Sequence, residues 1–295
     1  KKVVNEQGSA YRFELDAAGN VIEEIGFDDI TRRYERNPAG WVTKIKRPAE
    51  KLTNYVYDSC GRVTEVLYSD AKKETYTYRP DGELMQAVNE SATVQFERNV
   101  LGDILKETVN GEWIASEYDI FSNRTKISSS LGANITQQYN KMGDVLQMES
   151  PGWQAKFEHD KLGLETSRFL PGGISTQWQR DGIGRPVEQT VGHTAGNSFS
   201  TRKRKQYQWE VNDRLKQVKD EKGITKFEHD AWSNLAKTTF PNGEQQLRNP
   251  DAVGNLFRTA DRKDRVYAKG GQLKKANGWE YSYDAEGNLM EKKHV

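Results

Sequence analysis

The pentapeptide KFEHD occurs twice in this chain, at 156–160 and again at 226–230. Each copy sets a Glu, a His and an Asp side by side, and these are the side chains that most often act as general acids and bases. The two copies could therefore belong to an acid–base site. They could equally be one structural sequence used twice, and the surrounding chain decides between these interpretations.

A nine-residue pattern recurs thirteen times along the chain, as in FELDAAGNV (13–21), YVYDSCGRV (55–63) and YSYDAEGNL (281–289). The seventh residue of the pattern falls at positions 19, 40, 61, 82, 102, 122, 143, 163, 184, 213, 233, 254 and 287. The spacing is 20 or 21 residues, apart from one step of 29 and one of 33. A fixed period of this length is typical of a tandem-repeat architecture.

The chemistry of the pattern predicts a hairpin in each repeat. The seventh residue is Gly in ten of the thirteen segments, with Ser122, Asp213 and Ser233 as the exceptions, and the fourth is Asp in eight and Asn in three. An Asx side chain nucleates a turn, and a Gly in the left-handed conformation closes it. The predicted turn residues are Asp16, Gly19, Asp58, Gly61, Asp160, Gly163, Asp181, Gly184, Asp230, Asp251, Gly254, Asp284 and Gly287.

Aromatic residues occupy the strand before each turn. The first position is aromatic in ten of thirteen segments and the third is often aromatic. Positions one and three share a face of a strand, so one face is predicted to be aromatic and the other polar. The clearest repeat aromatics are Tyr55, Tyr57, Tyr76, Tyr78, Tyr281 and Tyr283.

This pattern accounts for KFEHD. Asp160 and Asp230 are turn residues, and the preceding His takes the third position, where other repeats carry Tyr. The Glu lies on the opposite face of the strand from the imidazole, so the two cannot act on one reacting group. We therefore predict a structural role for both copies, and no catalytic residues.

Composition limits the remaining function classes. The chain has 295 residues, 25 Gly, 13 Tyr, one Cys and a net charge of +1, with 44 Lys and Arg against 43 Asp and Glu. This balance favours neither a nucleic-acid nor a membrane partner. No stretch approaches 18 apolar residues, so no membrane span is expected. Four scattered His and a lone Cys60 show no metal-ligand spacing, and no phosphate loop or dinucleotide fingerprint is present, so no metal or cofactor is expected.

The pattern Y-x-Y-D-x-x-G-[NR]-[LV] resembles the YD repeats of Rhs proteins, which are related to repeats in Tc toxins and teneurins. YVYDSCGRV and YSYDAEGNL carry the resemblance most clearly, and it covers residues 11–290. It implies an all-β fold in which strand–turn–strand repeats form a spiralling β-sheet strip, part of a hollow, cocoon-like shell. It also implies a shell segment that encapsulates a C-terminal toxin for delivery, with the toxin domain and a secretion machinery, often type VI, as partners.

Residues 1–295 are accordingly expected to form a single repeat array, with longer inserts near 186–206 and 257–280 and no toxin domain. The D-P-x-G-type sequence at which Rhs shells end is missing, and Asn249-Pro250-Asp251 has the wrong order, so self-cleavage does not carry over. Thirteen repeats give roughly 26 strands, too few to close a shell, so we expect an open, curved sheet. The absence of an initiator Met suggests a fragment of a larger bacterial protein, cytoplasmic before its export.

Two alternatives stay open. The repeats could form a carbohydrate- or cell-surface-binding module, because aromatic hairpins of about 20 residues also occur in choline-binding proteins, although only Asn277-Gly278-Trp279 faintly resembles their motif. The basic run Arg202–Lys205 is expected to be a solvated loop or the lead-in to a strand, with an acidic cargo as the sharper alternative. An enzymatic function has no candidate constellation of residues.

Overall fold

The computed structural model describes residues 1–196 and 198–295 and divides into two compact units. The first unit contains residues 1–93 and 247–295, and the second contains residues 94–246. Regular structure in both is almost entirely β, with three short 3₁₀ turns among the described residues. The predicted all-β fold of tandem hairpins is therefore confirmed.

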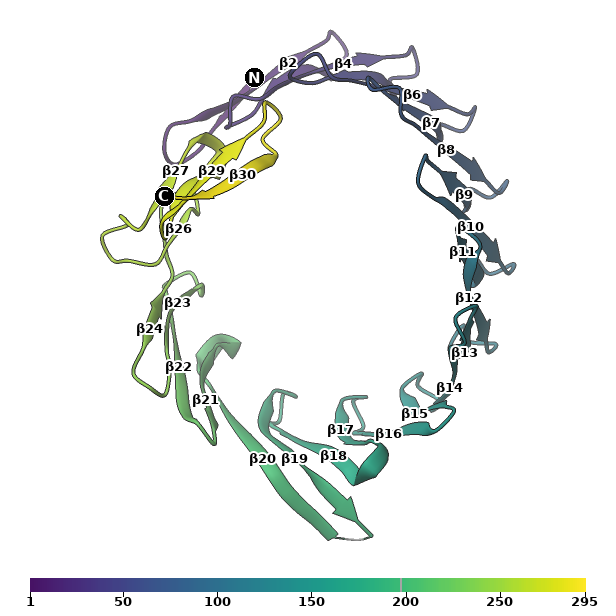
Figure 1. The fold of residues 1–295 in the computed structure, drawn as a ribbon, viewed down its shortest axis with the longest axis vertical. Helices are drawn as coiled ribbons and strands as arrows, with labels where there is room; N and C mark the ends of the chain where they lie inside the picture. Colours follow the sequence, from purple (N-terminus) through teal and green to yellow (C-terminus); the bar gives the residue numbers. More distant parts are fainter. Residues whose placement is uncertain (197) are drawn as a thin grey trace. The chain divides into compact units, whose positions relative to one another are not determined.

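The strands of the first unit come from both ends of the chain (Figure 1). They are β1 (Lys2–Val4), β2 (Ala10–Leu15), β3 (Val21–Ile25), β4 (Thr31–Arg36), β5 (Val42–Lys46), β6 (Leu52–Tyr57), β7 (Val63–Tyr68), β8 (Lys73–Tyr78), β9 (Leu84–Val88), β25 (Asn249–Pro250), β26 (Leu256–Phe257), β27 (Arg265–Tyr267), β28 (Leu273–Ala276), β29 (Trp279–Tyr283) and β30 (Leu289–His294). From β1 to β9 every strand pairs antiparallel with its predecessor, as do β25 with β26 and the four strands β27–β30.

The second unit has the same sequential organisation. Its strands are β10 (Thr93–Arg98), β11 (Ile104–Val109), β12 (Glu112–Tyr118), β13 (Arg124–Ser129), β14 (Asn134–Tyr139), β15 (Val145–Ser150), β16 (Trp153–His159), β17 (Glu165–Phe169), β18 (Ile174–Arg180), β19 (Pro186–Ala195), β20 (Ser198–Trp209), β21 (Leu215–Asp220), β22 (Gly223–His229), β23 (Leu235–Thr239) and β24 (Gln245–Leu247). Antiparallel pairing runs from β10 through β23 in sequence order.

The register of each hairpin is set by a bulge beside the turn. Tyr57 pairs with Val63, but the preceding Val56 pairs with Glu65, so the return strand carries one extra residue. The same shift recurs in the other YD hairpins, for example between Glu228 and His229. A type I turn followed by a left-handed residue produces such a bulge and increases the local twist.

A single layer of sheet gives this protein little enclosed core. Among the described residues only Ile30, Val66, Ala155, Phe257 and Ala276 are buried hydrophobic residues. The two sides of the strands nevertheless differ. Position-two Glu side chains pair across the strands with Lys, as Glu117 does with Lys126 at 2.7 Å, whereas the first-position aromatics lie on the opposite side.

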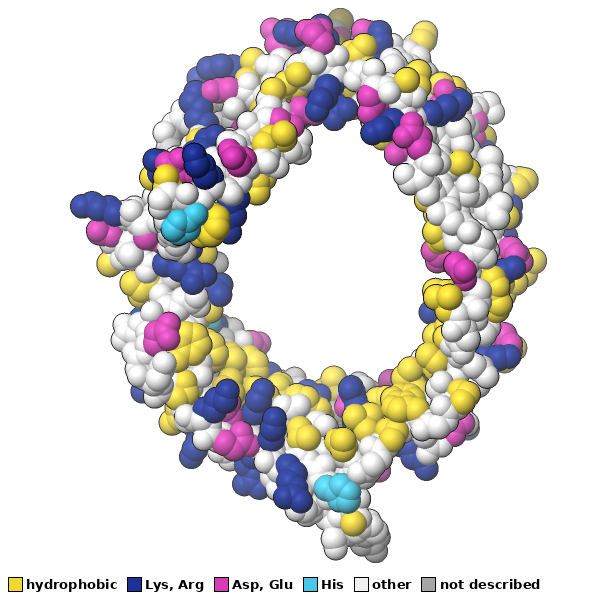
Figure 2. Space-filling view, in the orientation of Figure 1, with side chains coloured by type: hydrophobic (Ala, Val, Ile, Leu, Met, Phe, Trp, Pro, Cys, Tyr) yellow, Lys and Arg dark blue, Asp and Glu magenta, His cyan; other side chains and the backbone are white. Residues whose placement is uncertain are grey.

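The second unit is a curved strip whose concave side is rich in apolar side chains. Figure 2 shows hydrophobic side chains gathered on this side over the strands around β15–β22, with Lys, Arg, Asp and Glu more common toward the outside. The aromatic and polar faces predicted from the repeat thus correspond to the concave and convex sides of this unit.

Candidate functional site

The repeat turn is the most regular local site in the molecule. In the turn at residues 16–20, the Oδ1 atom of Asp16 accepts the backbone N–H groups of Ala18 at 2.9 Å and Asn20 at 2.8 Å. Gly19 closes the turn with φ +87° and donates its N–H to the Asp16 carbonyl at 3.0 Å. The side-chain amide of Asn20, which donates to the Asp16 carboxylate, lowers the pKa of that carboxyl below its usual value.

The other predicted turn residues lie in the same arrangement. The carboxylates of Asp58, Asp160, Asp181, Asp230, Asp251 and Asp284 each accept the N–H groups two and four residues on. Gly61, Gly163, Gly184, Gly254 and Gly287 all have φ between +76° and +90°. The three exceptions in the sequence pattern, Ser122, Asp213 and Ser233, adopt the same left-handed conformation with φ of 61°, 58° and 69°.

The two KFEHD copies occupy these hairpins without forming a shared site. Glu228 leaves the strand on the polar side, where its carboxylate pairs with the ammonium of Lys237 at 2.7 Å, and Glu158 is exposed. His159 and His229 follow on the other side of the strand and are half-buried. The Glu and His of each copy therefore face opposite sides of the sheet.

Third-position side chains link each hairpin to the one before it. The hydroxyl of Tyr57 donates to the carbonyl of Val42 at 2.6 Å, and that of Tyr78 donates to the carbonyl of Val63 at 2.7 Å. The same bond is made by Tyr118, Tyr139, Trp209 and Tyr283, and Arg36 and Arg180 reach the equivalent carbonyl through a guanidinium. The sequence analysis treated this position only as an aromatic one. The signal it missed is that Tyr, Trp and Arg are all long side chains with a terminal donor.

First-position aromatics pack against the return strand instead. Tyr55 lies opposite the buried Val66, and Lys292 lies over the ring of Tyr281 at 5.9 Å. The hydroxyl of Tyr76 donates to the carboxylate of Glu74 at 2.5 Å, and this bond, with burial, raises the pKa of Tyr76 to about 12. These aromatics therefore supply the packing, and the third position supplies the hydrogen bonds between repeats.

The segment near 257–280 differs from the expected long insert. Ala268 donates to the carbonyl of Gln272 at 2.8 Å and accepts from Gly271 at 3.2 Å, which is the hydrogen-bond pattern of the other repeat turns. Tyr267, in the third position, donates to the carbonyl of Leu256 at 2.7 Å. The sequence RVYAKGGQL (265–273) is therefore a fourteenth, shorter repeat, which the sequence analysis missed because Ala replaces the Asp of the turn.

The other long step, near 186–206, is an extended hairpin. Strands β19 and β20 have 10 and 12 residues and pair from Glu188–Gln206 to Ala195–Ser198. The basic run Arg202–Lys205 lies within β20, so it is part of a strand and the loop interpretation is wrong.

The ends of the chain meet in a seam inside the first unit, where three late turns lie against three early ones. We define the seam as the turns at 251–255, 268–272 and 284–288 together with those at 5–9, 26–30 and 47–51. Gln7 donates to the carboxylate of Asp251 at 2.8 Å, and Lys269 pairs with Asp29. In Figure 1, β27, β29 and β30 lie beside β2 and β4.

Glu286 is the most connected residue of the seam. Its carboxylate binds the guanidinium of Arg47 at 2.9 Å and the ammonium of Lys51, and its side chain is only 12% exposed. Backbones approach closely nearby, because a Cβ added to Gly270 would lie 2.6 Å from the Cβ of Asp28. The seam is thus a close-packed, charge-paired contact between segments about 240 residues apart, and no sequence pattern predicted it.

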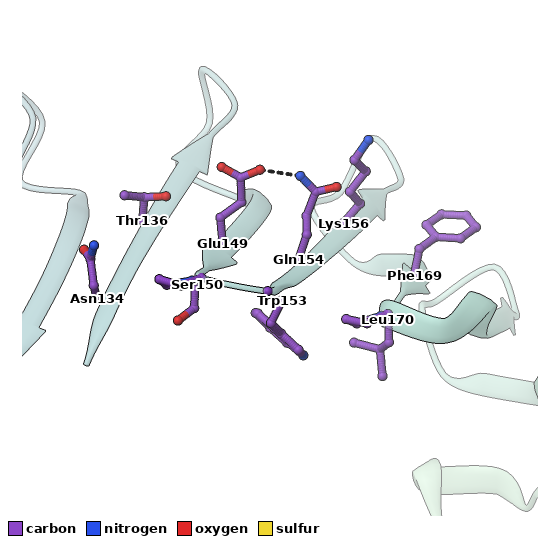
Figure 3. A pocket seen from close by; sticks show the side chains of 12 residues that line it. Asn134, Thr136, Glu149, Ser150, Trp153, Gln154, Lys156, Phe169 and Leu170 are labelled. Carbon is purple, nitrogen blue, oxygen red and sulfur yellow. Dashed lines mark hydrogen bonds between the residues drawn. The ribbon is translucent and has the colours of Figure 1, made fainter. Parts of the chain in front are cut away.

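The largest groove in the described part of the second unit lies across β14–β17 and has a volume of about 710 Å³. Figure 3 shows that the side chains around it leave the strands on two sides: Glu149, Gln154, Lys156 and Phe169 on one, and Ser150, Trp153 and Leu170 on the other. Glu149 and Gln154 are hydrogen-bonded to each other. Trp153, 40% exposed, therefore does not stack over the polar groups that a sugar would need.

Residues with metal-binding or nucleophilic potential are dispersed. No group of three or more His, Cys, Asp or Glu that could hold a metal ion occurs among the described residues. Cys60 is exposed in its turn as a free thiol. No helix in the described residues is long and apolar enough to cross a bilayer.

Comparison with known proteins matches this geometry to toxin components. No family model matches the chain. The crystal structure of TcdB2-TccC3 superposes on 96% of the chain with a TM-score of 0.74 at 9% identity, and the Photorhabdus luminescens Tc holotoxin pore on 97% with a TM-score of 0.73 at 10% identity. The chain spans 19% of each of these structures.

A curated protein is similar in sequence as well. The double-stranded DNA deaminase toxin A of Burkholderia cenocepacia is 23% identical over 381 residues, which cover 99% of this chain and 27% of that toxin. The chain therefore spans about a quarter of the curated relative. The predicted resemblance to the Rhs-type YD-repeat shells of toxin proteins is confirmed at the level of the fold.

Proposed function

We propose that this chain is a structural segment of the shell of a larger bacterial toxin protein, and that the shell encloses a toxin polypeptide until delivery. The observation that carries the proposal is the match of nearly the whole chain, 96–97% of it, to the Tc toxin structures. A curated toxin that aligns with 99% of the chain supports the same assignment.

The two faces of the second unit fit such a wall. An apolar concave side suits contact with a polypeptide whose own apolar groups are not all buried, whereas the charged side suits water. In this role the protein would hold its cargo without chemistry of its own. Export through a secretion machinery, type VI among those implied by the resemblance, would follow as part of the larger protein.

The seam suggests how the wall is kept closed. Adjacent parts of a one-layer strip have no common core, so contacts between turns must hold them together. The polar pairs at Asp251, Lys269 and Glu286 provide such contacts inside the first unit. In the proposed shell, turns along the strip edges would be the positions at which neighbouring stretches meet.

Protease protection tests the proposal. In the natural polypeptide that contains this chain, the toxin segment should survive trypsin at times when the same segment expressed alone is digested. Opening the seam with Glu286→Lys should accelerate its digestion, and the exposed Glu117→Lys should not. Equal digestion rates for the enclosed and the isolated toxin segment would overturn the proposal.

The alternative of a carbohydrate- or cell-surface-binding module predicts a different result. The chain alone would bind defined glycans on an array, and Trp153→Ala would reduce that binding. The opposite orientations of Trp153 and Gln154 at the groove favour the shell over this alternative (Figure 3).

A further inference from the structure

The extended hairpin of the second unit leaves one strand edge without a strand neighbour. Strand β20 pairs with β19 from Ser198 to Gln206, but its other neighbour, β21, pairs only with Gln206–Trp209. On that side the segment Thr201–Lys205 has no paired strand among those described. We call this segment the β20 edge. Such an edge presents backbone N–H and C=O groups that can pair with another chain.

The β20 edge is strongly basic and exposed. Arg202, Lys203, Arg204 and Lys205 follow one another, and all four are exposed. Of these, Arg204 has an acidic partner, with its guanidinium 3.5 Å from the carboxylate of Glu188. The other three basic side chains have no ion pair in the described residues.

Glu221 shows what the β20 edge can bind. Its carboxylate, which belongs to the turn after β21, accepts the backbone N–H of Arg204 at 3.0 Å. An outward-pointing backbone donor of this strand is therefore bound by a carboxylate. Beyond Arg204 the strand continues toward Thr201, still basic.

The same charges restrict the choice of partner. Lysines and a bulge are features by which natural edge strands avoid pairing with copies of themselves, and the register shifts between Val191 and Gly192, opposite Arg202. A second basic β20 edge would be repelled. An acidic strand would gain ion pairs as well as backbone hydrogen bonds.

We propose that the β20 edge at Thr201–Lys205 is a docking site for an extended, acidic peptide segment of a partner protein, which adds to the sheet as a strand. The partner's backbone pairs with β20, and its carboxylates pair with Arg202, Lys203 and Lys205. This inference is independent of the shell function, because it concerns an edge of the hairpin and not the enclosed face.

Fluorescence anisotropy with the whole chain and defined peptides tests the proposal. The probe is a labelled eight-residue peptide that alternates Glu with Thr or Val, compared with its Lys-for-Glu counterpart and with a backbone N-methylated acidic version. We expect the acidic peptide to bind and the other two to bind at least about tenfold more weakly. The variant Lys203→Glu/Lys205→Glu should lose binding by a similar factor, and the exposed Lys141→Glu should retain it.

Hydrogen exchange locates the bound peptide and covers a failure of the variant to fold. Peptide binding should protect backbone amides within Thr201–Lys205 of the unmodified chain. Equal binding of the N-methylated peptide would show a purely electrostatic contact and overturn strand addition. Unchanged binding by the charge-reversed variant, protection elsewhere, or no binding at millimolar peptide would overturn the site itself.

Discussion

Replacing Glu286 by Gln should loosen the last hairpins from the first unit. The amide keeps the size of the side chain but leaves the cations of Arg47 and Lys51 without their carboxylate. Exposed ion pairs contribute about 0.2–1 kcal/mol each, and hydrogen bonds to charged groups about 1.5–3 kcal/mol. Because Glu286 is mostly buried and its partners are partly exposed, we expect a loss of about 1–2 kcal/mol in the free energy of local opening.

Native-state hydrogen exchange measures this opening directly. A loss of 1–2 kcal/mol makes amides of β29 and β30 exchange about 5–30 times faster. Amides of the second unit, such as that of Gly163, should be unaffected. Glu286→Lys should accelerate exchange further, because it places three cations together.

The matched control is Glu117→Gln, which removes the ion pair of a 66%-exposed Glu with Lys126. It should change exchange by less than a factor of about three, as surface pairs contribute little. The reasoning would be refuted if both Glu286 variants exchanged like the unmodified chain, since the seam would then not hold the terminal hairpins in place.

Three further predictions concern the repeat itself. Tyr57→Phe removes the hydroxyl bond to the preceding hairpin and should cost about 1 kcal/mol in urea unfolding, whereas Tyr55→Phe, whose hydroxyl makes no such bond, should cost less; equal losses would contradict the inter-repeat role. Gly61→Ala should lower Tm more than Gly19→Ala, because both force Ala to a φ above +80° but only at Gly61 would the new Cβ meet an indole ring, at 2.8 Å; the reverse order would count against this packing. The backbone N–H of the turn lowers the pKa of Asp58, so its stabilisation is present above the unfolded-state pKa of about 3.9 and is lost as the pH falls through the lower folded-state pKa; Tm should therefore fall less steeply below about pH 4 in Asp58→Asn, and identical slopes would show that the carboxylate is not involved.

Local structure was predictable because local chemistry determines it. The Asp and Gly of the D-x-x-G pattern fix a turn within five residues, and the alternation of Tyr55, Val56 and Tyr57 fixes which face each side chain takes. The period then gives the order of the hairpins without further information. For the same reason KFEHD could be assigned to the turns before any coordinates were considered.

What escaped prediction depends on contacts between distant residues or on substitutions within the pattern. Nothing near Glu286 in the sequence indicates Arg47 or Lys51, because their proximity results from the curvature accumulated over the intervening hairpins. The turn at Ala268 lacks the Asp side chain that marks other turns, yet its backbone makes the same bonds. The strand at Arg202–Lys205 was hidden by charge, which is unusual inside a strand but common on an exposed edge.

Small-angle X-ray scattering of the isolated chain is the most direct test of the central claim, that this protein is a one-layer wall and not a filled domain. A compact globule of 295 residues has a radius of gyration of about 19 Å. The account predicts a clearly larger radius and a distance distribution without the single central peak of a filled particle. A radius near 19 Å with such a peak would contradict it.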